Sequence, residues 1–485
     1  MTTIATPLDR DHRSITISLL AAVALMSYAN LSVSAALPEI GDDLGRVELL
    51  PWLITVELLA AAIAVLAVGP VVDGFGVRPV FRLSVLAFVV ASIACALAPS
   101  MAVLVAGRVA QGLAAGGVLA SAFATIGLAY DPLLRPKVYA INSALWGVMG
   151  VGGPGLAAVL VSVAGWRAVF AVAVPIGLGA VVVGWRHLPG RPAEADRTDF
   201  DLRGLALIAV VTIALLFAAT ASSAWSLAWF APAVVAVVLY RRHARGHTDP
   251  VVRLDHLTAA QWRNLHLPAT LVVAGGTGAA AFLPVYVRAA RDGSAATAAF
   301  SVFFLSVGWS VAAWVSSRLQ QRHHPARVVL WGTRLLVISV GTAAGAAAVA
   351  APLAVLLVAF IGAGGGIGLS TTATLNLLQS RARPEEMGRI SSAHQFVRSL
   401  GFTYGAAVAG GVLLLVVRVR VGEVESVRRL LGGESEAAEP GVVDALADGY
   451  ALAVAAMAVV SIGALVTARR LHATRTADWA QVAAD

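Results

Sequence analysis

The chain has 485 residues, of which 59% are hydrophobic and only 13% are charged, and its formal net charge is +8. Soluble domains carry about 25% charged residues, so this composition excludes an ordinary soluble protein. The basic residues lie mostly in short loops between apolar segments, where membrane topology explains them better than nucleic-acid binding, and no nucleic-acid partner is expected.

Apolar segments recur along the sequence from Ile15 to Val466. A helix of roughly 20 apolar residues crosses a bilayer core about 30 Å thick, and lipid offers no partner to an unpaired backbone group. We therefore predict an all-α integral membrane protein with about 14 transmembrane helices. The predicted spans are residues 15–37, 50–70, 80–99, 104–127, 139–163, 167–185, 203–221, 225–242, 266–288, 296–317, 327–349, 353–378, 391–418 and 450–469.

The basic residues fall unevenly on the two sides of this arrangement. When the N-terminus is placed inside, the inner loops hold about three times as many basic residues as the outer loops, as in cytoplasmic loops generally. Both termini are therefore predicted to be cytoplasmic. Arginine greatly outnumbers lysine, of which Lys137 is the only example, and this bias favours a GC-rich bacterial genome. We expect a multi-pass protein of a bacterial cell membrane.

The sequence after the second span predicts a tight cytoplasmic turn. The segment reads Gly69-Pro-Val-Val-Asp73-Gly-Phe-Gly76-Val-Arg78. Glycine permits positive φ in such a turn, and Asp73 can cap the next helix and pair with Arg78. We interpret these residues as a conformational latch rather than a substrate site.

The fourth span carries a charged residue inside an apolar helix. Arg108 is followed by Gln111 and Gly112 in the order Arg-Val-Ala-Gln-Gly. A charge at the centre of a transmembrane helix costs at least about 2.5–3.5 kcal/mol, so Arg108 needs a partner or water. Gly112 and Gly116 form a Gly-x-x-x-Gly pair, which is typical of close helix packing.

The fifth span contains small residues and a proline in one short segment, namely Gly150, Gly153, Pro154 and Gly155. Proline removes a helix hydrogen bond, and glycine lets a second helix approach closely. This segment is therefore expected to bend and to pack tightly.

These three segments, in this order and on these spans, resemble the signature motifs of the major facilitator superfamily. The glycine–proline motif of the fifth span is associated with antiporters in that family. Other segments, including Ala36-Leu37-Pro38 at the end of the first span and Phe200-Asp201-Leu202-Arg203-Gly204, are similar to the 14-spanner drug:proton antiporters, the multidrug and quaternary-ammonium exporters.

The resemblance implies a major facilitator fold, in which two six-helix halves are parallel repeats and spans seven and eight are an additional pair. The expected parts are a cytoplasmic tail at 1–14, a six-helix bundle at 15–185, a linker with the two extra helices at 186–265, a second six-helix bundle at 266–469 with an outer loop at 419–449, and a cytoplasmic tail at 470–485.

Glu57 is the acidic residue that the sequence places most convincingly at membrane depth. Intramembrane acids indicate function by default, so Glu57 is the candidate proton carrier or the counter-charge for a cationic substrate. The alternative is a structural acid, bonded to neighbouring spans or paired permanently with Arg108. The resemblance implies that Arg108 contributes to proton coupling, and the alternative there is a structural arginine held by backbone carbonyls.

The first span departs from the family pattern. Members often carry an acid shortly before Ala-Leu-Pro, whereas this chain reads Tyr28-Ala-Asn30-Leu-Ser32. The missing acid favours a neutral or anionic substrate over a lipophilic dication. The side chains expected to line a substrate cavity, with core packing as the alternative for the aromatic ones, are Asn30, Asn142, Trp146, Trp309, Gln395 and Arg398.

No Gly-x-x-x-x-Gly-Lys loop is present, so ATP is not the expected energy source. No cofactor or metal is expected, since His323 and His324 fit a solvated turn. We predict a monomeric antiporter that uses the proton gradient to export small, largely apolar organic compounds, such as drugs, antibiotics or biocides, by alternating access. The alternative is uptake or facilitated diffusion of a metabolite; a membrane enzyme and a non-transporting sensor are disfavoured.

Overall fold

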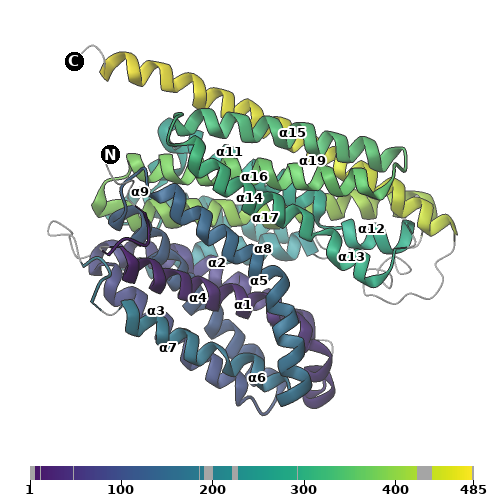
Figure 1. Cartoon of the computed structure of the whole chain (residues 1–485), viewed down its shortest axis with the longest axis horizontal. Coiled ribbons are helices and arrows are strands. Elements are labelled where there is room, and N and C mark those ends of the chain that lie inside the picture. The colour runs from purple at the N-terminus through teal and green to yellow at the C-terminus, as the bar shows by residue number, and fades with distance from the viewer. Residues whose placement is uncertain are drawn as a thin grey trace. The chain divides into compact units, whose positions relative to one another are not determined.

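The computed structural model describes residues 6–10, 12–46, 49–184, 186–190, 200–220, 228–291, 293–422 and 440–482. Every regular element within these ranges is a helix (Figure 1). Much of the predicted linker before the seventh span and most of the predicted outer loop 419–449 lie outside the described residues.

Contacts divide the chain into two compact units. Unit 1 comprises Met1–Ala218, Leu227–Ala259 and Leu378–Phe396. It contains α1 (Arg13–Leu44), α2 (Leu50–Phe75), α3 (Val77–Ala96), α4 (Met101–Ala129), α5 (Arg135–Ala164), α6 (Trp166–Ala171), α7 (Ala173–Gly184), most of α8 (Leu202–Thr220), α9 (Phe230–Gly246), α10 (Leu254–Thr258) and the 3-10 helix η3 (Pro384–Glu386).

Unit 2 comprises Ala219–Ser226, Ala260–Leu377 and Val397–Asp485. Its apolar core joins distant parts of the sequence, because Val272, Phe360, Leu413 and Val454 are all fully buried in one cluster. The helices of this unit are α11 (Ala260–Ala280), α12 (Leu283–Ala290), α13 (Ala295–Ser301), α14 (Phe303–Leu319), α15 (Pro325–Ala348), most of α16 (Leu353–Arg381), most of α17 (Met387–Val421) and α19 (Pro440–Val482).

Each predicted span overlaps helix among the described residues. Among the described residues, ten helices are long and apolar enough to cross a membrane, and α5 makes an eleventh if its two bent parts count as one span. The other predicted spans correspond to α8, α9 and the α13–α14 pair. The count of 14 spans and the predicted domain boundaries therefore remain predictions.

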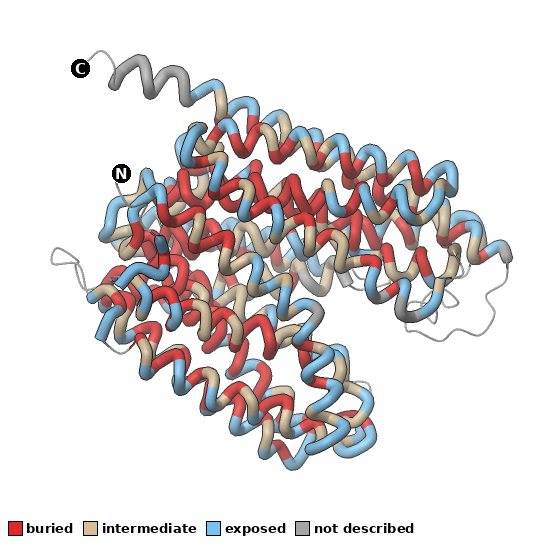
Figure 2. Tube along the Cα trace, viewed as in Figure 1, coloured by how far each residue is buried: buried red, intermediate tan, exposed pale blue. Residues whose placement is uncertain are grey.

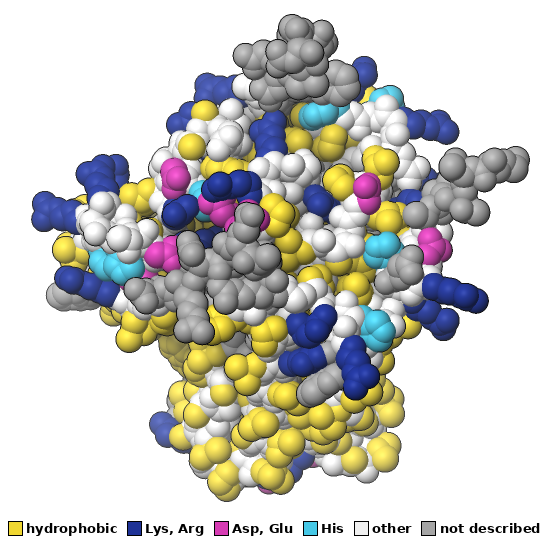
Figure 3. All heavy atoms as spheres, turned by 90° about the vertical axis from the view of Figure 1, so that its left-hand side faces the viewer, with side chains coloured by type: hydrophobic (Ala, Val, Ile, Leu, Met, Phe, Trp, Pro, Cys, Tyr) yellow, Lys and Arg dark blue, Asp and Glu magenta, His cyan; other side chains and the backbone are white. Residues whose placement is uncertain are grey.

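The outward faces of the helices suit a lipid environment. Buried and exposed residues alternate along the helices (Figure 2). On α3, Leu83 and Val90 leave 71% and 66% of their surface exposed, which is the arrangement expected where lipid covers apolar side chains. The end face in Figure 3 carries many Lys and Arg side chains and fewer Asp and Glu side chains. Which side of the membrane this face meets remains a prediction.

The predicted close packing at Gly112 and Gly116 is confirmed. A Cβ atom built on Gly116 of α4 would lie 2.5 Å from the carbonyl oxygen of Ala61 and 2.6 Å from Cβ of Ala64, both on α2. Real Cβ atoms do not come this close, so only glycine allows the two backbones to approach to this distance.

The bend predicted for the fifth span is confirmed, whereas the predicted tight packing around all of its glycines remains a prediction. The two parts of α5 meet at 40°, between Gly150 and Gly152. Gly153 lies near α1, with a built Cβ 3.7 Å from Cβ of Leu31. However, a Cβ on Gly150 or Gly155 would meet no described atom within 4 Å. Both glycines are exposed, so within the described part of unit 1 no helix packs closely against them.

We expect Gly116→Ala to lower the free energy of unfolding by about 1–3 kcal/mol, because the new methyl group must push α2 away from α4. Gly341→Ala on α15 is the matched control, since a Cβ there has open space and alanine favours a helix. Unfolding of both purified variants in detergent, followed by denaturant titration, measures the difference. Equal stability of the two variants would contradict the close approach.

Candidate functional site

Glu57 of α2 is buried and bonded to two other helices. Only 4% of the residue's surface is exposed. Its Oε2 atom accepts a hydrogen bond from Nδ2 of Asn30 on α1 over 3.1 Å and from Nη2 of Arg108 on α4 over 3.4 Å. One carboxylate oxygen therefore joins α1, α2 and α4.

Arg108 is fully buried, and its guanidinium uses three separate contacts. Nε donates to the carbonyl oxygen of Leu53 over 2.8 Å, and Nη1 donates to Oε1 of Gln111 over 2.8 Å. The third contact is the ion pair with Glu57. Both structural interpretations from the sequence are thus present together, since Arg108 is paired with Glu57 and is also held by a backbone carbonyl. A buried pair of this kind needs such extra hydrogen bonds to offset the loss of hydration.

Gln111 extends these contacts to α3. Its Nε2 atom donates to Oγ of Ser92 over 2.8 Å. Gly112 brings the helices together at this level, because a Cβ there would lie 2.3 Å from the carbonyl oxygen of Glu57. We refer below to the buried polar network, which consists of Asn30, Glu57, Ser92, Arg108 and Gln111 and links four helices.

Asp73 at the end of α2 accepts hydrogen bonds from the first turn of α17. Its Oδ1 bonds the backbone N–H of Gly388 over 2.6 Å, and its Oδ2 bonds that of Arg389 over 2.9 Å. These N–H groups have no partner within their own helix, and the positive end of the helix dipole favours a carboxylate there. Gly69 allows the approach, because a Cβ at this position would lie 2.8 Å from Cβ of Ser392.

The predicted pairing of Asp73 with Arg78, and the predicted capping of the next helix by Asp73, are wrong. The N-cap of α3 is Gly76, at φ 86°, and it makes no side-chain capping bond. Nε of Arg78 donates instead to the carbonyl oxygen of Leu188 over 2.8 Å. The physical reason is that Asp73 lies inside α2, where its side chain reaches the free N–H groups of α17.

The predicted cavity residues are divided between the two units. In unit 1, Asn30 bonds Glu57, Trp146 is 37% exposed, and Gln395 is buried. Asn142 lines a cavity of about 20 Å³ between α1, α4 and α5, which is too small for an organic substrate. In unit 2, the ring of Trp309 stacks on Phe402 with centroids 6.1 Å apart. Arg398 also belongs to unit 2, so a single cavity lined by all six residues remains a prediction.

Asp201 fixes the start of α8. Oδ1 accepts from the backbone N–H of Gly204 over 2.7 Å and pairs with Nε2 of His243 over 2.7 Å, while Oδ2 accepts from the N–H of Val251 over 3.2 Å. Burial raises the pKa of Asp201, but these hydrogen bonds outweigh burial and bring the pKa below its ordinary value. The carboxylate is therefore ionised at neutral pH.

Comparison with known families settles the class of protein. The profile of the Major Facilitator Superfamily matches residues 17–406. The chain belongs to the major facilitator superfamily. It is thus a multi-pass membrane transporter of the cell membrane, as the motifs and the apolar helices predicted.

Several relatives are named as drug exporters. The multidrug transporter protein MdtP of Bacillus subtilis is 26% identical over 394 residues, which cover 79% of this chain and 71% of MdtP. The probable multidrug-efflux transporter Rv1634 of Mycobacterium tuberculosis is 28% identical over 444 residues, covering 87% of this chain and 91% of that protein. The tetracenomycin C resistance and export protein of Streptomyces glaucescens is 27% identical over 414 residues, covering 83% and 75%.

Solved structures share the fold. The human organic anion transporter MFSD10 (TETRAN) superposes with a TM-score of 0.62 at 17% identity, covering 92% of this chain and 98% of that chain. The proton:xylose symporter XylE superposes with a TM-score of 0.57 at 12% identity, covering 92% and 94%. The chain therefore has the helical fold of major facilitator transporters.

A double-mutant cycle tests the ion pair in the buried polar network. Arg108→Gln is expected to lower the free energy of unfolding by about 3–5 kcal/mol, because Glu57 stays buried without its cation. Adding Glu57→Gln removes that uncompensated charge, so the double variant should be no less stable than Arg108→Gln alone. Denaturant titration in detergent gives the four stabilities. Additive losses would show that the two side chains do not interact.

Proposed function

We propose that this chain is a proton-coupled antiporter that exports small, largely apolar organic compounds. The observation that carries this proposal is the position of Glu57, a membrane-depth carboxylate shared by Asn30 and Arg108. The drug-export names of the relatives support the substrate class.

The buried polar network suits reversible protonation of Glu57. When Oε2 takes a proton, the carboxyl group loses its negative charge and its ionic attraction to Nη2 of Arg108. The bonds from Arg108 to Leu53 and Gln111 do not involve Glu57. The arginine therefore stays in place while the contact between α2 and α4 weakens, and protonation changes the interaction of two helices without leaving the cation unbonded.

The proposed cycle couples this change to alternating access. A proton binds Glu57 from the outside, the substrate is released there, and loss of the proton to the inside restores substrate binding. Movement of one charge through 100 mV releases about 2.3 kcal/mol. That energy supports roughly a 50-fold concentration ratio of an uncharged substrate per proton.

Asn30 bears on the charge of the substrate. It lies in the first span, where family members often have an acid, and it donates a hydrogen bond to Glu57 instead of adding a second negative charge. A site with one carboxylate already paired with Arg108 attracts dications weakly. We therefore propose neutral or anionic substrates, and Asn30→Asp provides the variant that adds the missing charge.

Glu57→Gln tests the proposed proton carrier. We expect this variant to lose proton-driven accumulation of substrate in everted vesicles, because an amide cannot exchange the proton. The matched control is Asp42→Asn, which removes an exposed carboxylate from the end of α1 and should leave transport unchanged. Undiminished accumulation by Glu57→Gln would remove Glu57 from the mechanism. Accumulation rather than exclusion of the substrate by intact cells would favour the uptake alternative.

A series of compounds that differ in charge tests the proposed substrate class. Cells that express the unaltered chain should exclude neutral and anionic dyes better than dicationic ones. Asn30→Asp should improve the exclusion of dications, because it places a second carboxylate beside Glu57. Minimal growth-inhibitory concentrations in an efflux-deficient host give the comparison. Strong export of dications by the unaltered chain would contradict the proposed preference.

A further inference from the structure

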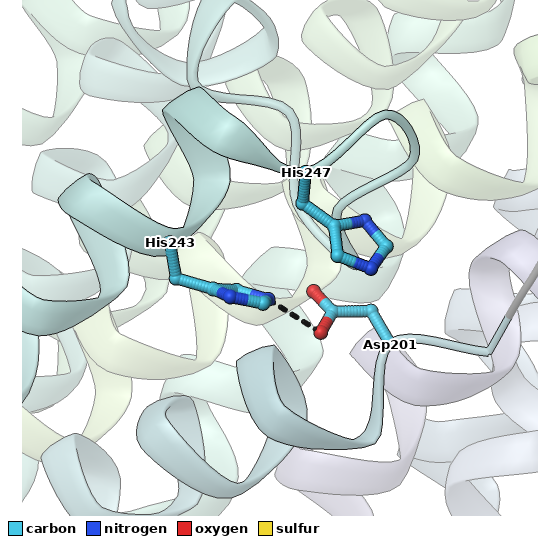
Figure 4. A group of neighbouring side chains, drawn as sticks. All are labelled: Asp201, His243 and His247. Atoms are coloured by element: carbon cyan, nitrogen blue, oxygen red, sulfur yellow. Dashed lines mark hydrogen bonds and ion pairs between the residues drawn. The ribbon is translucent and has the colours of Figure 1, made fainter.

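Asp201, His243 and His247 converge where α8 begins and α9 ends (Figure 4). Asp201 directly precedes α8, while His243 is in the last turn of α9 and His247 is its C-cap. Residues four apart on a helix lie on the same face, which brings both imidazole rings toward the carboxylate. One possible ligand atom from each residue lies within 4.8 Å of the other two.

This combination of donors is one that transition-metal ions prefer. Zn²⁺ is bound by His nitrogen and carboxylate oxygen at about 2.0–2.2 Å in tetrahedral geometry, which separates two ligand atoms by roughly 3.3 Å. The contact between Oδ1 of Asp201 and Nε2 of His243 is 2.7 Å, and no pair of the three ligand atoms exceeds 4.8 Å. These values bracket the required separation. Side-chain movements on the order of 1 Å would bring the ligand atoms to one ion.

The surroundings can hold the carboxylate while a metal binds. The N–H groups of Gly204 and Val251 bond the Asp201 carboxylate and orient it, as second-shell donors do in metal sites. The residue is almost completely buried, since 2% of its side chain is exposed, whereas the side chain of His243 is 14% exposed. The negative end of the α9 dipole also favours a cation at this place.

Metal binding must replace two existing contacts. Nε2 of His243 would exchange its hydrogen bond with Asp201 for the metal. Nδ1 of His247 accepts from the backbone N–H of Asp249 over 3.1 Å. Coordination through Nε2 of His247 would move the ring proton to Nδ1 and end that bond. Binding therefore depends on pH and competes with protons, as for imidazole ligands in general.

We propose that Asp201, His243 and His247 form a binding site for a divalent transition-metal ion of the Zn²⁺ class. The ion cross-links the start of α8 to the end of α9 and so stabilises the additional helix pair. Three protein ligands leave a fourth position for water, which suits an ion that exchanges with solution. This site differs from the buried polar network in residues and in chemistry, and its test does not involve transport.

The test uses the full-length chain, purified in detergent without a polyhistidine tag and treated with a chelator. Co²⁺ is the spectroscopic probe, because tetrahedral coordination by nitrogen and oxygen gives visible absorption bands. We expect saturable binding of Co²⁺ that Zn²⁺ displaces, and a higher unfolding temperature with Zn²⁺. His247→Gln should weaken Co²⁺ binding at least about tenfold and abolish the Zn²⁺-dependent rise in unfolding temperature.

Two variants distinguish loss of this site from metal binding at other histidines and from misfolding. His247→Gln keeps the bond between Asp201 and His243, and the side-chain carbonyl of Gln can replace the ring nitrogen that accepts from the N–H of Asp249, so its unfolding temperature without metal should stay close to that of the unaltered chain. Substitution of both His323 and His324 by Gln, in the turn between α14 and α15, is the control and should leave binding unchanged. Co²⁺ binding of unchanged affinity in His247→Gln, or the absence of saturable Co²⁺ and Zn²⁺ binding to the unaltered chain, would overturn the proposal.

Discussion

The arrangement of the first four helices depends on one constraint, which is the burial of the Arg108 guanidinium at membrane depth. A charge there is tolerated only with several partners. Leu53 and Glu57 of α2 bond the guanidinium directly. Gln111 of α4 also bonds it and links it to Ser92 of α3. Gly112 has no side chain and thereby lets α2 come within hydrogen-bonding reach of Arg108. The close packing of α2 on α4 and the pairing of Arg108 with Glu57 thus support each other. Glu57, the proposed proton carrier, belongs to the same buried polar network.

Much of this arrangement could be predicted from the sequence because its causes are local. The lengths of the apolar segments predict the helices, and a deep acid in the second span and a deep arginine in the fourth make an ion pair one of the two interpretations that the sequence allows. The partners of Asp73 could not be predicted in this way. They are backbone N–H groups of Gly388 and Arg389, more than 300 residues away, and no residue type or spacing marks a backbone donor. The sequence pointed instead to Arg78, which is close to Asp73 along the chain.

The glycine positions also show what the sequence alone does not determine. Gly116 and Gly150 are equally small, yet the first lies against α2 and the second is exposed within unit 1. The sequence predicts where a close approach is permitted, and the tertiary structure decides where it occurs. The spacing of His243 and His247 was a visible signal for metal binding, but the third ligand candidate, Asp201, comes from another helix start. Only the folded chain brings the three together.

Arg389 connects three segments in unit 1. Its backbone N–H bonds Asp73 of α2, while its guanidinium forms two hydrogen bonds with Asp249, in the chain between α9 and α10. Withdrawal of the first turn of α17 from α2 would therefore strain or break the link to Asp249 as well. The chain between α9 and α10 is thus attached through Arg389 to the contact of Asp73 with α17, so a substitution at Asp249 is expected to alter how readily that contact opens.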